Sequence, residues 1–149
     1  MRYFRVGETT EGWERLGRDF SHPVFAPSLL ASRIDGCEIR IQDLPILQCA
    51  VGNWDWELWC ETFGVSLSNL TFAHEFDTDD AALHACVAGL GVMLAPPILT
   101  AREIRSGALV TLSTYESVEM GEYCYRRHSD SMVAQNFCFW METEMRGGK

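Results

Sequence analysis

The chain has 149 residues, of which 21 are acidic and 12 are Lys or Arg, so its formal net charge at pH 7 is −9. An apolar fraction of 47% with eight Phe and five Trp excludes a disordered chain, and this length suits one compact domain or one lobe of a two-lobed domain. Because phosphate binding requires clustered Lys and Arg, the acidic balance argues against direct binding to nucleic acid or to an anionic membrane.

No apolar run reaches the roughly 18 residues of a spanning helix, and the N-terminus has no signal-peptide pattern. We therefore expect a soluble, cytoplasmic protein. Its cysteines show no metal-ligand spacing, so we predict reduced, mostly buried thiols and neither a metal site nor a cofactor. The six cysteines are Cys37, Cys49, Cys60, Cys86, Cys124 and Cys138.

The first half of the chain contains two predicted strands and one predicted helix. Residues 20–25 form the first strand, after a polar segment at 7–17 that we interpret as a loop. The apolar run at 45–51 is typical of a strand buried on both faces. Asn53 is the predicted N-cap of a helix over 54–63, which is amphipathic and stops before a glycine.

The second half repeats this alternation of strands and helices. A partly alternating strand at 70–76 leads to four polar residues that can cap a small-residue helix at 81–88. A buried strand at 90–95, a helix at 98–106 and a strand at 109–112 follow. Successive strand–helix–strand units predict the α/β class, with a mainly parallel sheet and helices on both faces.

The C-terminal part has a different sequence pattern. Residues 123–127 form a predicted short strand after a polar stretch without a helical pattern. Residues 130–145 form a predicted amphipathic helix. Its apolar stripe consists of Met132, Val133, Phe137, Trp140, Met141 and Met145.

Several short motifs follow one another in a fixed order. Residues 22–30 are HPVFAPSLL, residues 76–78 are FDT, residues 88–92 are AGLGV and residues 107–110 are GALV. In order and spacing they resemble the effector-binding domain of LysR-type transcriptional regulators, whose patterns are PVCSPxLL, F(D/N)(S/T), AGxGVxLxP and GxLV. The WxxW pair and the closing FxxWL of that family also have counterparts at 56–59 and 137–141.

This resemblance implies the fold of a type 2 periplasmic binding protein, and mainly its second lobe. Residues 20–127 would form that lobe, and residues 1–19 and 128–149 would cross to or pack on the first lobe. The family's winged helix-turn-helix and most of its first lobe have no counterpart here, so DNA would be contacted only through a segment outside this chain. We expect a homo-oligomer, namely a dimer.

The resemblance also implies a function: binding a small-molecule effector whose occupancy changes transcription through a conformational change. The alternative is a stand-alone metabolite-binding or dimerising decoy fragment without DNA binding. No nucleophile elbow, zinc-protease motif, P-loop or dinucleotide fingerprint is present, so we predict no enzymatic activity.

Ligands of open parallel sheets bind beyond the carboxyl ends of strands, where helices begin. The candidate ligand-binding residues at the ends of the two central strands are Asn53, Trp54, Asp77, Thr78 and Asp79. The resemblance places a cleft-lining hydroxyl at Thr78 and a tyrosine at Tyr123 or Tyr125. Plain helix capping also explains Thr78 and Asp77, and the clustered carboxylates favour an amino-acid-like effector with an ammonium group.

Overall fold

The computed structural model describes residues 1–31, 39–49 and 52–147, with the side chains described to Met145. The chain divides into two compact units. One, here called the terminal unit, consists of Met1–Phe20 and Glu119–Lys149. The other, the central unit, is Ser21–Val118. Two long strands belong partly to each unit, and each unit is described by itself below.

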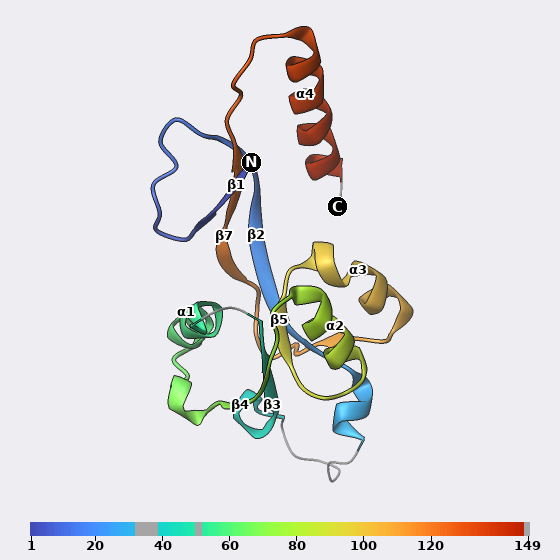
Figure 1. The fold of residues 1–149 in the computed structure, drawn as a ribbon. Helices are drawn as coiled ribbons and strands as arrows, with labels where there is room; N and C mark the ends of the chain where they lie inside the picture. Colours follow the sequence, from blue (N-terminus) through green and yellow to red (C-terminus); the bar gives the residue numbers. More distant parts are fainter. Residues whose placement is uncertain (32–38, 50–51, 148–149) are drawn as a thin grey trace. The chain divides into compact units, whose positions relative to one another are not determined.

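From β2 onwards the α-helices and strands follow the predicted order, whereas β1 was not predicted. In chain order they are β1 (Arg2–Arg5), β2 (Glu14–Phe25), β3 (Pro45–Gln48), α1 (Trp54–Phe63), β4 (Thr71–Glu75), α2 (Asp79–Val87), β5 (Met93–Ala95), α3 (Pro97–Ser106), β6 (Val110–Thr111), β7 (Val118–Tyr125) and α4 (Met132–Gly147) (Figure 1). The predicted loop at 7–17 is wrong at its end, because β2 already begins at Glu14. The start of this strand consists mostly of polar residues and therefore resembles a loop in the sequence. Leu16 is the buried side chain there.

The middle of the central unit is a small parallel arrangement around β3. On one side β3 pairs in parallel with β4, and on the other Ile46 forms a parallel bridge with Val92. The Leu47 N–H donates to the Val92 carbonyl, and the Val92 N–H donates to the Pro45 carbonyl, each at 2.8 Å. Gly91 permits this approach, because a Cβ there would lie 2.6 Å from the Pro45 carbonyl oxygen.

The predicted mainly parallel sheet is not confirmed. In the five-stranded sheet, β1 pairs with β7, and both β5 and β6 pair with β2, all in the antiparallel sense. The strand–helix–strand units do give the parallel contacts of β3. The flanking strands β2 and β7 are not joined to their partners by a single crossover helix, so the sequence pattern does not fix their direction. The α/β class itself is confirmed.

Small residues on α2 form the tightest part of the core. Ala82 and Cys86 are fully buried, and the Cys86 thiol donates to the Val24 carbonyl at 3.3 Å. The buried cluster around them consists of Val24, Ala26, Leu47, Ala82, Leu83, Ala85, Cys86, Met93, Ala95 and Leu109. Trp56 and Trp59 of α1 are also fully buried, as the predicted apolar stripe of this helix requires.

The terminal unit is built on the antiparallel pair β1 and β7 and carries α4. A Cβ at Gly121 would lie 2.1 Å from the Phe4 carbonyl oxygen, so these strands meet at a glycine. The phenol of Tyr125 contacts Glu142 of α4, and Met145 reaches Gly17 of β2. Within the described residues, no helix has the length and apolar character needed to cross a membrane.

Candidate functional site

Two helices of the central unit begin at one edge of its parallel strands. The chain passes from β3 to α1 and from β4 to α2. Because β3 and β4 are parallel neighbours, their carboxyl ends lie at the same edge, and the Phe76 N–H still donates to the Gln48 carbonyl there at 2.9 Å. The N-termini of α1 and α2 are thus both connected to this edge, as the sequence predicted.

Thr78 caps α2. Its backbone is extended (φ −140°, ψ 147°), and its hydroxyl oxygen accepts a hydrogen bond from the Ala81 N–H at 3.3 Å. This bond does not use the hydroxyl proton, and the N–H groups of Asp79 and Asp80 have no acceptor within the helix. The start of α2 therefore holds donors suited to a carboxylate or another anion.

The predicted capping role of Asn53 is wrong. Asn53 occupies the N-cap position of α1, but its backbone is left-handed (φ 55°) and its side chain makes no capping bond. Gly52 before it also has a positive φ of 87°, so two consecutive residues before the helix adopt left-handed backbone. The carboxylate of Asp55 instead accepts from the Trp56 N–H at 2.9 Å.

The Asn53 side chain has an unsatisfied group. Its Oδ1 atom is buried, and within the described part of the chain it has no hydrogen-bond partner. A buried carbonyl oxygen without a donor costs free energy, on the order of 1–3 kcal/mol.

Cys49 links the two helix starts. It follows β3, and its thiol lies near the carboxylate of Asp79, at the start of α2. Burial first, and then the neighbouring carboxylates of Asp79 and Asp55, raise the pKa of Cys49 from 9.0 to about 12. Cys49 was not among the predicted site residues, although its position directly after a buried strand was a usable signal.

Carboxylates surround the donors of this site. Asp77, Asp79 and Asp80 are exposed, and Asp55 lies on the first turn of α1. One of these carboxylates, that of Asp80, forms an ion pair with His84 at 3.5 Å, and both side chains are highly exposed. A site with anion-binding N–H groups beside several carboxylates matches a molecule that carries both an anionic and a cationic group.

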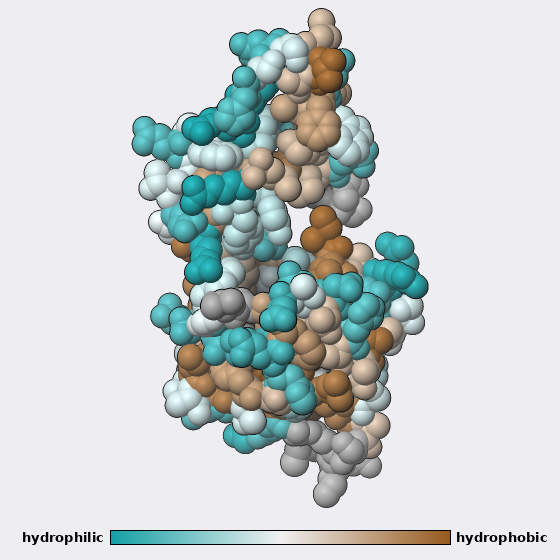
Figure 2. All heavy atoms as spheres, in the orientation of Figure 1, coloured by the Kyte–Doolittle hydropathy of each residue, from teal (hydrophilic) through white to brown (hydrophobic). Residues whose placement is uncertain are grey.

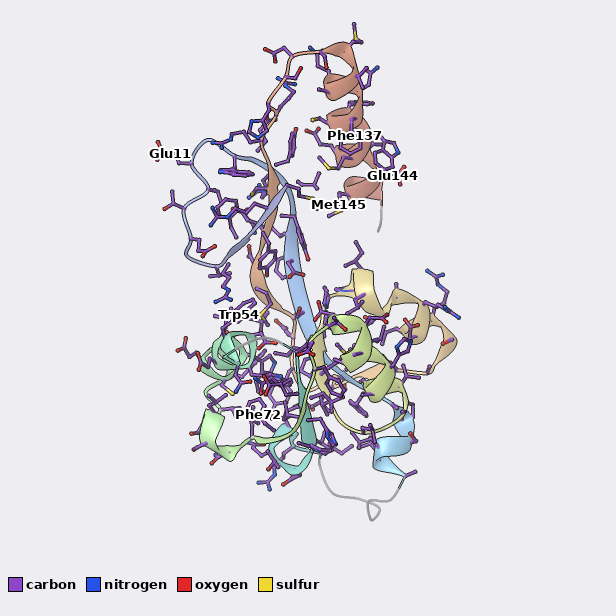
Figure 3. The ribbon with its side chains drawn as sticks, in the orientation of Figure 1. Glu11, Trp54, Phe72, Phe137, Glu144 and Met145 are labelled. Carbon is purple, nitrogen blue, oxygen red and sulfur yellow. The ribbon has the colours of Figure 1, made fainter. Side chains whose placement is uncertain are left out.

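Trp54 gives the site an aromatic border. It is the first residue of α1, where Figure 3 labels it, and it is half-buried. Trp56 and Trp59 point into the core instead and pack edge to face with ring centroids 5.6 Å apart. Of the tryptophans in this helix, Trp54 is therefore the one that is not fully buried.

Tyr123 and Tyr125, the other predicted ligand-binding residues, belong to the terminal unit. Tyr123 is half-buried and packs against Tyr3 with ring centroids 5.0 Å apart. The hydroxyl of Tyr125 lies 2.9 Å from Glu14 and also contacts Glu142, and these bonds together with burial raise its pKa. The structure does not place either tyrosine in the unit that holds the helix starts.

No group of three or more His, Cys, Asp or Glu side chains positioned to hold a metal ion occurs among the described residues. Of the predicted free thiols, Cys60, Cys86 and Cys124 are buried, Cys49 and Cys138 are half-buried, and all five are unpaired. Cys37 lies outside the described residues. The chemistry available at the helix starts is thus hydrogen bonding and charge.

Comparisons with known proteins agree on one family. The LysR substrate binding domain family matches residues 5–146. The HTH-type transcriptional regulator PerR of Escherichia coli (strain K12) is 33% identical over 132 residues, which cover 85% of this chain and 43% of PerR. The chain therefore spans less than half the length of this curated relative.

Solved structures share the fold. The effector domain of the transcriptional regulator AmpR of Pseudomonas aeruginosa superposes with a TM-score of 0.73 at 22% identity, covering 98% of this chain and 70% of that one. Full-length LysG of Corynebacterium glutamicum, solved with bound effector Arg, superposes with a TM-score of 0.73 at 15% identity. That match covers 96% of this chain and 50% of LysG.

Proposed function

The chain belongs to the LysR substrate binding domain family, and from this premise we propose that it binds a small-molecule effector at the starts of α1 and α2. The observation that carries the proposal is that the parallel strands β3 and β4 end at the same edge, from which the chain leads into α1 and α2. This arrangement presents hydrogen-bond donors and carboxylates in one place. The proposal predicts binding without turnover.

An amino-acid-like effector fits these groups. Its carboxylate would accept from the Thr78 hydroxyl and from the N–H groups at the start of α2. Its ammonium group would face the carboxylates of Asp77 and Asp79. The arginine bound to LysG is a precedent for this ligand class in the family.

In this proposal Trp54 borders the effector. Tyr123 and Tyr125 lie on β7, a strand that belongs partly to each unit. In this proposal the effector favours one arrangement of the lobes of a larger regulator, and the change reaches DNA through a winged helix-turn-helix segment. Residues 20–127 would act as the second lobe, with 1–19 and 128–149 serving the first. The regulator would act in the cytoplasm as a dimer.

A second candidate function is a dimerising or metabolite-sequestering module that acts without DNA. The apolar side chains exposed on α4, among them Val133 and Trp140, favour self-association. Light scattering gives the oligomeric state, which distinguishes the two candidates only when it is combined with the test for metabolite binding. A dimer that binds no metabolite would favour this second function.

The experiment is a thermal-melting screen of the purified chain against the twenty amino acids, small peptides and small carboxylates. A ligand that binds the folded state raises the melting temperature by mass action. We expect a selective shift that is lost in Thr78→Val, which lacks the hydroxyl, and retained in Thr78→Ser, which keeps it.

Loss of the helix cap must be separated from loss of binding. Ser131 caps α4 in the terminal unit through the same kind of bond, accepting from the Ala134 N–H at 3.2 Å. Ser131→Ala therefore loses a cap without touching the site, and its ligand-induced shift should equal that of the wild type. An unchanged shift in Thr78→Val would contradict the proposed site.

A further inference from the structure

Three aromatic rings of the central unit pack against one another. Trp59 and Phe63 belong to the second half of α1, and Tyr115 belongs to the segment between β6 and β7. The ring centroids lie 4.7 Å apart for Trp59 and Tyr115, 5.1 Å apart for Phe63 and Tyr115, and 5.0 Å apart for the two rings of α1. These residues, here called the aromatic triangle, join α1 to a segment that comes much later in the chain.

The segment that carries Tyr115 is itself anchored. The Tyr115 N–H donates to the Leu112 carbonyl at 3.1 Å, and the Leu112 N–H donates to the Pro23 carbonyl of β2 at the same distance. Leu112 and Val118, on either side of Tyr115, are both buried, and Val118 is the first residue of β7. The Tyr115 ring is thus held by the strands β2 and β7, and not by the parallel strand that α1 follows.

The aromatic triangle contacts the half of α1 that lies away from the proposed effector site. Asp55 lies on the first turn of the helix, whereas Trp59 and Phe63 lie about one and two turns further along. Backbone hydrogen bonds keep a helix of ten residues nearly rigid. The place at which the second half of α1 is held therefore determines where its first turn lies.

The first turn of α1 carries a charge that acts at the site. The Asp55 carboxylate accepts from the Trp56 N–H at 2.9 Å, so its position follows that of the helix backbone. This carboxylate contributes, after burial and the Asp79 carboxylate, to the raised pKa of Cys49. A displacement of α1 would therefore change the surroundings of the Cys49 thiol without any substitution at the site itself.

We propose that Tyr115 is a positioning residue for the effector site: its ring, packed against Trp59 and Phe63, holds α1 so that the first turn stays at the edge where β3 ends. The consequence for effector binding rests on the proposed function, whereas the position of α1 can be followed without any ligand. The contact is made by the ring and not by the hydroxyl. Phenylalanine should therefore replace Tyr115, and leucine, which offers no aromatic edge or face, should not.

The test measures the reactivity of Cys49 in the whole chain, with iodoacetamide as the probe. Peptide mass spectrometry gives the alkylation rate at about pH 8 and about pH 9 in the wild type, Tyr115→Leu and Tyr115→Phe. We expect Tyr115→Leu to react at least about threefold faster at both pH values. The reason is that a displaced α1 removes burial and negative charge from the thiol, and the thiolate is the reactive form. Tyr115→Phe should react at the wild-type rate.

Global unfolding must be separated from a displacement of α1. Alkylation that requires global unfolding accelerates steeply with urea, because much surface becomes exposed, whereas alkylation through a local displacement depends little on urea below the unfolding transition. We expect the weak dependence for Tyr115→Leu. The matched control is Phe4→Leu, which removes an edge-to-face contact with Trp13, at 5.4 Å, in the terminal unit. Its Cys49 rate should equal that of the wild type.

Three results would overturn the proposal: an unchanged Cys49 rate in Tyr115→Leu, an equal increase in Tyr115→Phe, or an increase with the steep urea dependence of global unfolding. None of them depends on an effector. With an effector found in the melting screen, calorimetry should show binding at least about threefold weaker in Tyr115→Leu and unchanged in Tyr115→Phe. Equal affinity in Tyr115→Leu would contradict the positioning role, while a screen without any effector would contradict the proposed function and leave the Cys49 rates as the test of Tyr115.

Discussion

The amphipathic helices α1 and α4, one in each unit, use their aromatic residues in opposite ways. In the central unit, Trp56 and Trp59 are fully buried. In the terminal unit, Phe137 and Trp140 are 57% and 55% exposed, although they lie on an apolar stripe with the same helical spacing (Figure 3). Periodicity therefore identifies which face of a helix is apolar, but it does not show whether that face is covered.

This contrast bears on function. The buried tryptophans anchor α1 in the central unit, where the Trp59 ring packs against the Tyr115 ring with centroids 4.7 Å apart. The exposed residues of α4 instead leave apolar surface available for other molecules, and Figure 2 shows tan and brown residues along this helix. We expect mutations in the central unit to act on stability and those on α4 to act on recognition.

The largest expected effect is on the free energy of unfolding. Trp56→Ala should lower it by about 3–5 kcal/mol, because it removes a large fully buried side chain and leaves a cavity. Trp140→Ala should change it by less than about 0.5 kcal/mol, since surface substitutions rarely do more. Urea denaturation followed by circular dichroism measures both. Equal losses would show that α4 is as tightly packed as α1.

Gly121→Ala should destabilise the terminal unit by about 1–3 kcal/mol, because the added Cβ collides with backbone. That Cβ would lie 2.1 Å from the Phe4 carbonyl oxygen, which cannot move without disturbing β1. Gly17→Ala is the control, since its Cβ would meet only the end of the Met145 side chain at 3.1 Å. Thermal unfolding compares the two, and a Gly17→Ala protein less stable than Gly121→Ala would refute the packing described here.

The helix caps should contribute similarly in both units. Thr78→Ala removes the bond to the Ala81 N–H, and Ser131→Ala removes the bond to the Ala134 N–H. Each should lower the free energy of unfolding by about 1 kcal/mol. Hydrogen exchange of the first-turn amides in each helix measures the local effect. No change in either variant would mean that the caps stabilise neither helix.

The smallest effect is on the reactivity of a thiol. Because the pKa of Cys49 is raised to about 12, its thiolate is scarce at pH 8 and alkylation by iodoacetamide should be slow. Asp79→Asn removes one cause of the raised pKa and should speed alkylation, whereas Asp80→Asn should not. Peptide mass spectrometry measures the rate at Cys49, and equal rates in the two variants would contradict the contact with Asp79.

The same raised pKa has a consequence for stability. The folded state holds the Cys49 proton more tightly than the unfolded state, whose thiol has a pKa near 9.0. The contribution of Cys49 is therefore complete below pH 9 and is lost as the pH rises towards 12. Cys49→Ser should reduce the slope of stability against pH in this window.

Much of the fold followed from local signals in the sequence. The helix at 54–63 was predicted from its apolar stripe and its stop at Gly64, and it has these bounds in the structure. The direction of the flanking strands could not be predicted, because it depends on long-range pairing of β2 with β5 and β6. Leu16 alone marks the early start of β2, too weak a pattern to read as a strand.

The candidate site was predicted in part. The position of Thr78 before α2 identified both its cap and its place at a strand end. The left-handed backbone of Asn53 was not predictable, since Asn is common both at caps and in such turns. The link through Cys49 depends on which strands are neighbours, a relation that no local pattern contains. The ligand contacts themselves stay predictions.

The most direct test of the central claim is a nuclear magnetic resonance titration of the ¹⁵N-labelled chain with the amino acid that raises its melting temperature most. The account predicts that the largest backbone amide shifts fall at Asp79 and Asp80, with the Asn53 side-chain amide shifting at the same ligand concentration. Shifts confined to residues away from the starts of α1 and α2, or no shifts with any amino acid, would contradict it.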